Sequence, residues 1–221
     1  MSRKKAEASL LAEAAEWRLI GLLLERPRRG WHEEVATLSS ELHGRDLRRC
    51  AAAARSSKEG DYLRLFGPGG LASPREVAYQ PFADPGALLA ELAAIYAAFG
   101  YRPHTEEPID HIAVEVGFVG YLLLKEAFAA ARGDRAAVST TASARRKFVE
   151  THLAELAGAF ARRVENAGES YMRTAVRLLA RRVPARRARP RLVSVDPDDL
   201  CGACAGLEFG ATAGGAHGLT S

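Results

Sequence analysis

The stretch from residue 106 to residue 125, EEPIDHIAVEVGFVGYLLLK, constrains the fold of this chain more than any other. After its acidic opening it is apolar on nearly every side of a helix, and such a helix lies inside a protein rather than on its surface. Pro108 suits a first helical turn, and the acidic residues beside it suit the positive end of the helix dipole. Gly117 and Gly120 share a face and let a neighbouring backbone come close. A buried central helix of this kind indicates an all-α domain.

The composition favours the same fold class. Alanine and leucine dominate, β-branched residues are sparse, and 221 residues are enough to bury one substantial core. We therefore predict an all-α, single-domain helical bundle over residues 1–183. From 184 to 221 the chain changes to arginine, proline and then glycine-alanine runs, which predicts a flexible tail that carries the CGAC motif.

Breakers and caps predict several helix boundaries. Asp84-Pro85 is typical of a helix start and Gly100 of a helix end, so we expect a helix between them. The central helix should end near Gly133, and the next should begin at one of the caps between residues 139 and 143. Residues 67–84, which contain GPGG and PREVAY, are long for a loop in a compact domain, and such loops are often functional.

Charge and apolar runs exclude some function classes. The net charge of +4 comes from arginine clusters, and the basic run over residues 181–191 lacks interleaved aromatic residues that would stack on bases. We therefore expect no nucleic-acid partner. The apolar run at residues 19–24 is too short for a membrane span or a signal peptide, which predicts no integral membrane contact and a cytoplasmic location.

The acidic opening of the central helix allows three interpretations. Glu107, His111 and Glu115 are spaced four residues apart, so on a helix they share one face that could hold a metal ion. Alternatively, Asp110 and Glu107 cap the helix while His111 satisfies a buried loop carbonyl. In the third interpretation the acidic end is a docking point for a basic peptide, with apolar walls beside it.

The three cysteines do not form a disulfide framework, which favours a reducing compartment. Cys201 and Cys204 have the spacing of a redox pair or of half a zinc site, with His217 as a third ligand. A metal- or redox-active protein that uses this pair, or the Glu107/His111/Glu115 face, is therefore the alternative to a binding protein. An exposed tail without chemistry is the simpler interpretation of the pair.

Four motifs together carry a family resemblance: YLRLFGPGG from residue 62, PREVAY from residue 74, IYAAFGY from residue 95 and EPIDHIAVEVGFV from residue 107. With these motifs the chain resembles the TorD/DmsD family of redox-enzyme maturation chaperones, which is related to the nitrate reductase delta-subunit chaperones. The resemblance spans about residues 6–182 in helix order, and the CGAC tail lies outside it. Val119 stands where many relatives have methionine.

The resemblance implies an all-helical cytoplasmic chaperone that is not an enzyme and has no cofactor of its own. Such a chaperone binds the twin-arginine signal peptide on the precursor of a molybdenum-containing oxidoreductase of the dimethyl sulfoxide reductase family. It holds the catalytic subunit back from export until the molybdopterin guanine dinucleotide cofactor has been inserted. Either a monomer or a dimer is compatible with this role.

The resemblance assigns peptide binding to the EPIDH motif and to the YLRLF motif. A twin-arginine peptide offers two guanidinium groups and a short apolar stretch, so its receptor needs carboxylates and an apolar groove. Glu106 adds a carboxylate beside the EPIDH motif. The full set of candidate peptide-binding residues is Asp110, His111, Glu107, Pro108 and Glu115 for the polar part, and Tyr62, Leu65, Phe66, Tyr79 and Phe118 for the apolar part.

Overall fold

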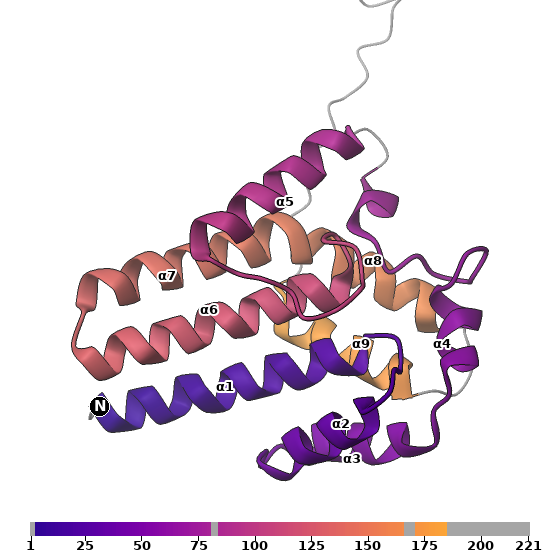
Figure 1. Ribbon diagram of the computed structural model, residues 1–221, viewed down its shortest axis with the longest axis horizontal. Coiled ribbons are helices and arrows are strands. Elements are labelled where there is room, and N and C mark those ends of the chain that lie inside the picture. Colours follow the sequence, from indigo (N-terminus) through magenta and orange to yellow (C-terminus); the bar gives the residue numbers. More distant parts are fainter. Residues whose placement is uncertain (1–2, 81–83, 166–170, 185–221) are drawn as a thin grey trace, which may run out of the picture. The chain divides into compact units, whose positions relative to one another are not determined.

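The structure of this chain is a computed structural model that describes residues 3–80, 84–165 and 171–184 (Figure 1). In this part of the chain the regular structure is helical apart from one isolated β-bridge, which confirms the predicted all-α class. The helices are α1 (Arg3–Leu23), α2 (Trp31–Ser40), α3 (Arg45–Ala53), α4 (Glu59–Phe66), α5 (Pro85–Phe99), α6 (Ile112–Arg132), α7 (Arg135–Phe148), α8 (Ala154–Glu165) and α9 (Tyr171–Arg182).

The chain divides into two compact units, Met1–Arg186 and Arg187–Ser221. All described residues belong to the first unit. The predicted tail, from residue 185 on, lies outside the described residues together with Cys201, Cys204 and His217. The separation of a chaperone domain from this tail therefore stays a prediction. Among the described helices, none combines the length and the apolar character that crossing a membrane requires.

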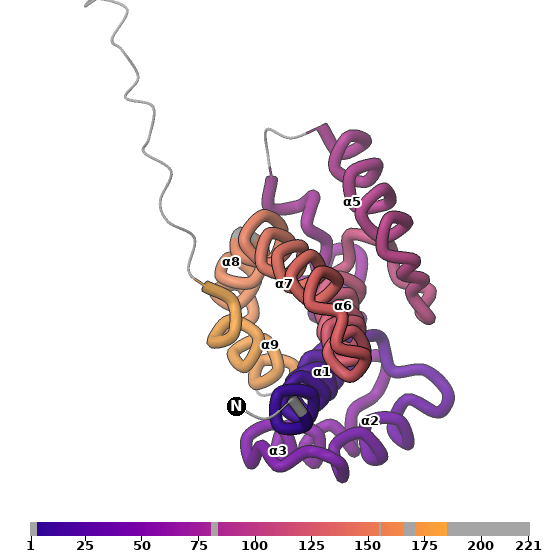
Figure 2. Tube along the Cα trace, turned by 90° about the vertical axis from the view of Figure 1, so that its left-hand side faces the viewer, coloured from indigo at the N-terminus to yellow at the C-terminus, as the bar shows by residue number. Residues whose placement is uncertain are grey.

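Helices α1 and α6 lie side by side along most of their length and form the centre of the core (Figures 1 and 2). A Cβ atom at Gly120 would lie 3.3 Å from the carbonyl oxygen of Ala14, and one at Gly21 would lie 3.1 Å from that of Ala113. The predicted close approach at Gly120 is thus confirmed. Gly117 faces the hydroxyl of Tyr101 instead, 2.7 Å from where its Cβ would be.

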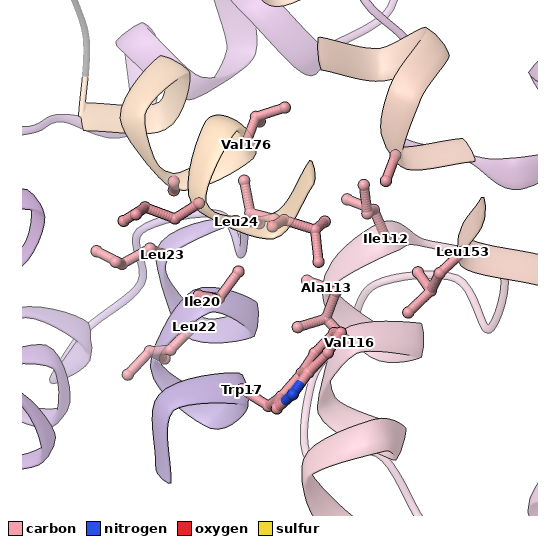
Figure 3. Packing of buried hydrophobic residues seen from close by; sticks show 14 of the residues in the cluster. Trp17, Ile20, Leu22, Leu23, Leu24, Ile112, Ala113, Val116, Leu153 and Val176 are labelled. Atoms are coloured by element: carbon pink, nitrogen blue, oxygen red, sulfur yellow. The ribbon is translucent and has the colours of Figure 1, made fainter. Parts of the chain in front are cut away.

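The core between these helices is mainly aliphatic where α1 ends and α6 begins, with Trp17 beside Val116 (Figure 3). The almost fully buried residues are Ile20, Leu23 and Leu24 at and just after the end of α1, and Ile112 and Val116 at the start of α6. Burial of this kind contributes about 25 cal/mol per Å² of apolar surface. It therefore fixes the start of α6, which is the end that carries the EPIDH motif.

Every residue of α6 up to Gly120 is buried, as its apolar sequence predicts. The second half of the helix differs from the prediction, because Leu124 and Phe128 are exposed. These two residues are four positions apart and so lie on one face. The helix is therefore central only in its first half, and its second half lies at the edge of the bundle.

Two predicted boundaries are confirmed at glycine and aspartate caps. The side chain of Asp84 accepts a hydrogen bond from the backbone N–H of Gly86 at 2.8 Å, which caps α5. Gly100 and Gly133 end α5 and α6 with φ angles of 68° and 75°, a region that glycine adopts without strain.

Two predicted helix starts are wrong. Helix α6 begins at Ile112 rather than at Pro108, because the side chain of His111 provides the cap and the residues before it form a loop. Helix α7 begins at Arg135 rather than between residues 139 and 143, because Asp134 accepts a hydrogen bond from the N–H of Ala137 at 2.9 Å. In both cases the side chain that caps the helix belongs to another residue than the one expected from the sequence.

Helices α7 and α8 are joined without a loop through a π-helical turn at Val149–Leu153. The extra residue of a π turn rotates the side chains that follow it. This turn places His152 in the interior, where it faces the 3₁₀ turn Glu76–Tyr79 within PREVAY. Helix α9 packs on α8 and also contacts α1 and α3.

Candidate functional site

Two of the recognised motifs are joined by backbone hydrogen bonds. Arg75 and His111 form an isolated antiparallel β-bridge. The N–H of Glu76 donates to the carbonyl of Asp110 at 2.9 Å, and the N–H of Ile112 donates to the carbonyl of Pro74 at 2.8 Å. PREVAY is therefore fastened directly to EPIDH at the start of α6.

Asp110 reinforces this junction from the inside. Its carboxylate is completely buried and accepts hydrogen bonds from the Arg75 guanidinium, with Nε 2.8 Å and an Nη 2.7 Å from Oδ1. A buried carboxylate needs such a partner because its charge has lost its hydration. Asp110 therefore holds the PREVAY segment in place and does not face solvent.

His111 connects the start of α6 to α4. Its Nδ1 accepts a hydrogen bond from the N–H of Ala113 at 3.1 Å, so the ring proton is on Nε2. Nε2 lies 2.8 Å from the hydroxyl of Tyr62, which in turn donates to Oε1 of Glu107 at 3.3 Å. Burial, and secondarily the charge of Arg75, lowers the pKa of His111 to about 3, so the ring is neutral.

The hydroxyl of Tyr62 also keeps its proton. Burial raises its pKa, and the neighbouring Glu107 carboxylate adds to that effect. Nε2–H of His111 thus donates to the Tyr62 hydroxyl, and that hydroxyl donates to Glu107, whose carboxylate lies at the surface of a cleft. Neutral donors aligned in this way fix the position of the Glu107 side chain, which also accepts from the backbone N–H of Arg26 at 3.3 Å.

This cleft has a volume of about 530 Å³ and lies between α4, the GPGG turn and the loop before α6. Its walls are apolar beside α4 and charged at the mouth. The lining residues are Arg26, Tyr62, Leu63, Phe66, Gly67, Pro68, Gly69, Gly70, Ser73, Pro74, Arg75, Glu106, Glu107, Pro108 and His111.

Arg26, Glu106 and Glu107 form the mouth of the cleft on the side of α1, and Glu59 lies beside Arg26. Carboxylates outnumber cations there. The guanidinium of Arg26 lies 3.2 Å from a carboxylate oxygen of Glu106 and 3.7 Å from one of Glu59. Glu107 is bound to the backbone N–H of the same residue. Two carboxylates are thus paired with the Arg26 guanidinium and a third with its backbone, whereas Arg75 on the other wall is matched by Asp110.

The GPGG turn requires glycine because the backbone passes close to α4. A Cβ at Gly67 would lie 2.5 Å from the carbonyl oxygen of Leu63, and one at Gly70 would lie 2.6 Å from that of Leu65. The N–H of Ala72 donates to the Leu65 carbonyl at 3.0 Å. The turn is therefore folded back onto the end of α4, where it forms one wall of the cleft.

The structure brings five of the ten predicted site residues to the cleft surface, namely Tyr62, Phe66, Glu107, Pro108 and His111. The other five do not line it. Asp110 is paired with Arg75, Leu65 and Phe118 are core residues, and Tyr79 donates from its hydroxyl to the carbonyl of Ser73 at 2.7 Å. Glu115 is fully buried.

The predicted helical face of Glu107, His111 and Glu115 does not exist, because Glu107 precedes the helix. Burial raises the pKa of Glu115 well above the ordinary value, and the neighbouring carboxylates of Glu76 and Asp110 add to that effect. Glu115 therefore keeps its proton and can donate a hydrogen bond to Glu76. Glu76 is itself buried and lies 3.1 Å from Nδ1 of His152. This polar cluster lies inside the domain, behind the β-bridge.

Within the described residues, no group of three or more histidine, cysteine, aspartate or glutamate side chains is placed to hold a metal ion. Cys50 is buried, with its thiol 3.2 Å from the carbonyl of Tyr171. A second groove, of about 340 Å³ between α3 and α9, is lined partly by arginines. Of the predicted basic run, Arg181 lies 3.8 Å from Asp46 and Arg182 lies 2.7 Å from Glu16.

Three residues of the site were not predicted from the sequence. Arg26 lies eighty residues from Glu106 in the sequence, and only the turn that follows α1 brings the two together. Arg75 and Glu76 are charged residues inside the recognised PREVAY motif, in a loop otherwise rich in glycine and proline. Their position in that motif was the available signal, since a charge in such a segment needs a partner when it is buried.

Comparison with known proteins supports the resemblance carried by the motifs. The model of the nitrate reductase delta subunit family matches residues 25–162, which is more than half of the chain. All residues that line the cleft and all four motifs lie within this range. No curated protein matches the chain. The described helices, the cleft motifs and this match agree with one another. The chain belongs to the nitrate reductase delta subunit family, a family of redox-enzyme maturation chaperones.

Proposed function

We propose that this chain is a cytoplasmic chaperone that binds the twin-arginine signal peptide of a molybdenum-containing oxidoreductase of the dimethyl sulfoxide reductase family. It holds the precursor until the molybdopterin cofactor has been inserted and catalyses no reaction itself. The observation that carries the proposal is the cleft, where the YLRLF, GPGG and EPIDH motifs meet and carboxylates lie beside an apolar wall.

The chemistry of the cleft suits the two parts of such a peptide. Glu106 and Glu107 at the mouth can accept charge-assisted hydrogen bonds from guanidinium groups, which are stronger than those between neutral groups. Leu63 and Phe66 on the α4 wall can receive the apolar residues that follow the arginines. Leu63 is 42 % exposed although it is apolar, so covering it with a ligand would be favourable.

The buried residues of the motif have a supporting role in this proposal. Asp110 and His111 hold the two cleft walls together, so replacing them is expected to disturb folding as well as binding. Glu106 and Glu107 are the better residues to test, since both lie at the surface of the cleft. Glutamine at these positions removes the charge and keeps the size.

Isothermal calorimetry with a synthetic peptide that has two adjacent arginines and a short apolar stretch tests the proposal. The Glu106→Gln/Glu107→Gln variant should bind about tenfold or more weakly, since a hydrogen bond to a charged group contributes about 1.5–3 kcal/mol. The Glu33→Gln/Glu41→Gln variant removes the same charge from exposed positions on and after α2 and should bind like the unmodified chain. Equal affinity in all three proteins, or no binding by any, would refute the proposal.

A further inference from the structure

The most unusual feature of the cleft mouth is that a guanidinium group already lies there. Arg26 lies just after the end of α1, and its side chain reaches Glu106 at 3.2 Å and Glu59 at 3.7 Å. Those two carboxylates come from the loop before α6 and from the first residue of α4. A single arginine therefore links three segments that are otherwise joined on this side by Tyr62 and Glu107.

From this arrangement we infer that Arg26 is an internal competitor, which occupies the place of a ligand guanidinium when no ligand is bound. The inference rests on the proposed function, since it names the residue that an incoming arginine must displace. It goes further because it makes Arg26 a determinant of how strongly cationic peptides bind.

The positions of the partners make the displacement inexpensive. The side chains of Arg26, Glu59 and Glu106 are 40 %, 55 % and 90 % exposed, so the ion pairs at the mouth are in contact with water. Ion pairs of this kind are weak, because water screens the attraction and both side chains lose freedom. Arg26 can therefore turn into solvent when another cation takes its place.

Displacement leaves the rest of the site in place. The contact between Arg26 and Glu107 uses the backbone N–H of Arg26, which every replacement except proline retains. Glu107 also keeps its hydrogen bond from Tyr62. Removal of the Arg26 side chain should thus free Glu59 and Glu106 without moving the carboxylate that is nearest the interior.

The charge balance at the mouth indicates the chemistry of the ligand. Glu59, Glu106 and Glu107 carry three negative charges against the one positive charge of Arg26. The charge of Arg28 also acts on Glu106, but its guanidinium is paired with Glu34, so two negative charges remain unbalanced. A segment with two adjacent arginines would balance them, whereas an acidic segment would be repelled and a neutral segment would gain no attraction. Without Arg26 the mouth would carry three unbalanced charges and would attract such a segment more strongly.

The first test measures peptide affinity in Arg26→Ala, with Arg26→Gln as a second variant that keeps most of the side-chain length. Both should bind the two-arginine peptide about threefold to tenfold more tightly than the unmodified chain. Arg132→Ala is the matched control, since Arg132 lies over the Phe128 ring at the opposite end of α6 and its loss changes the net charge equally. If the unmodified chain binds the peptide and both Arg26 variants bind it equally or more weakly, Arg26 is not a competitor, although the proposed function stands.

A second test does not need the peptide. Methylguanidinium at a few hundred millimolar should lower the melting temperature of Arg26→Ala less than that of the unmodified chain or of Arg132→Ala, because the small cation can occupy the vacated place. The high concentration is needed because exposed ion pairs contribute only about 0–1 kcal/mol. Sodium chloride at equal ionic strength corrects for screening. If no variant binds the peptide, the proposed function fails, and this test still decides the inference: equal responses in the three proteins would overturn it.

Discussion

At the scale of single residues, His111 is the group on which the cleft most depends. One ring nitrogen caps α6 and the other binds Tyr62 from α4, so a neutral imidazole links two segments that are far apart in the sequence. A protonated ring could not accept the hydrogen bond from the N–H of Ala113. Acid should therefore weaken the link between the two walls.

The lowered pKa of His111 predicts how stability depends on pH. Below about pH 6.5 the unfolded chain binds a proton at this residue, while the folded chain does so only near pH 3. The contribution of His111 to the free energy of unfolding is thus complete above pH 6.5, and it is lost progressively as the pH falls towards 3. In this window its loss should approach about 1.4 kcal/mol per pH unit.

Urea unfolding of the chain and of His111→Asn at several pH values between 7.5 and 4 measures this contribution. Asparagine can still cap α6 but does not titrate, so its stability should fall less steeply with acid than that of the unmodified chain. The raised pKa of Glu115 has the opposite effect, because it makes stability fall as the pH rises above the ordinary pKa of a glutamate. Glu115 is present in both proteins, so its effect cancels in the comparison. Parallel curves for the two proteins would show that His111 is not held neutral.

How far the site could be predicted from the sequence differs from residue to residue. The acidic and aromatic residues of EPIDH and YLRLF could be chosen by their motifs, and five of the ten do line the cleft. Asp110 could not be placed, because its direction depends on Arg75, thirty-five residues earlier. Glu115 could not be placed either, since the helix begins after His111 and turns that side chain inward.

At the scale of elements, the contact between α1 and α6 determines where EPIDH is held. The helices approach so closely that a methyl group at Gly21 would lie 3.1 Å from one backbone atom of α6 and 3.4 Å from another. Backbone atoms in the middle of packed helices cannot move aside easily. The fit therefore depends on a hydrogen atom at this position.

Gly21→Ala should accordingly destabilise the protein by about 1–3 kcal/mol, even though alanine is the better helix former. Gly60→Ala is the matched control, because Gly60 lies in α4 and an added Cβ there meets nothing within 4 Å. That change should be neutral or stabilising by up to about 1 kcal/mol. Chemical denaturation of both variants measures the difference, and equal effects would show that the helices are not in tight contact at Gly21.

The helix boundaries show which local sequence signals are sufficient to predict where a helix begins or ends. Asp84 and Gly100 predicted both ends of α5, because an aspartate cap and a left-handed glycine act within a few residues. The start of α6 was predicted too early, since the β-bridge to PREVAY keeps residues up to His111 out of the helix. The π turn between α7 and α8 had no local signal at all, and it serves a distant contact between His152 and Glu76.

At the scale of the whole molecule, the described core is one continuous cluster that extends from Ala14 to Val183. It joins side chains from the beginning of the chain to its last described helix. Composition and apolar periodicity were enough to predict such a bundle, because they depend on local sequence. The arrangement of α5 and of the loop before α6 depends on long-range contacts, among them that of Tyr96, whose hydroxyl donates to the Ile109 carbonyl at 3.1 Å.

A chain that ends after Arg186 should therefore fold like the full chain. We expect its melting temperature to differ by less than about 2–4 °C, which corresponds to about 1 kcal/mol for a domain of this size. Circular dichroism during heating measures the difference, and calorimetry with the two-arginine peptide shows whether binding persists. A loss of cooperative melting would mean that residues 187–221 contribute to the core.

The central claim is that an arginine-bearing segment binds in the cleft between α4 and the loop before α6. Photo-crosslinking tests it most directly, with a peptide that carries a photoreactive residue next to its two arginines, followed by mass spectrometric mapping on the full chain. The account predicts crosslinks within residues 62–75 and 106–111, which excess unlabelled peptide suppresses. Crosslinks concentrated in the groove between α3 and α9, or spread evenly over the surface, would contradict it.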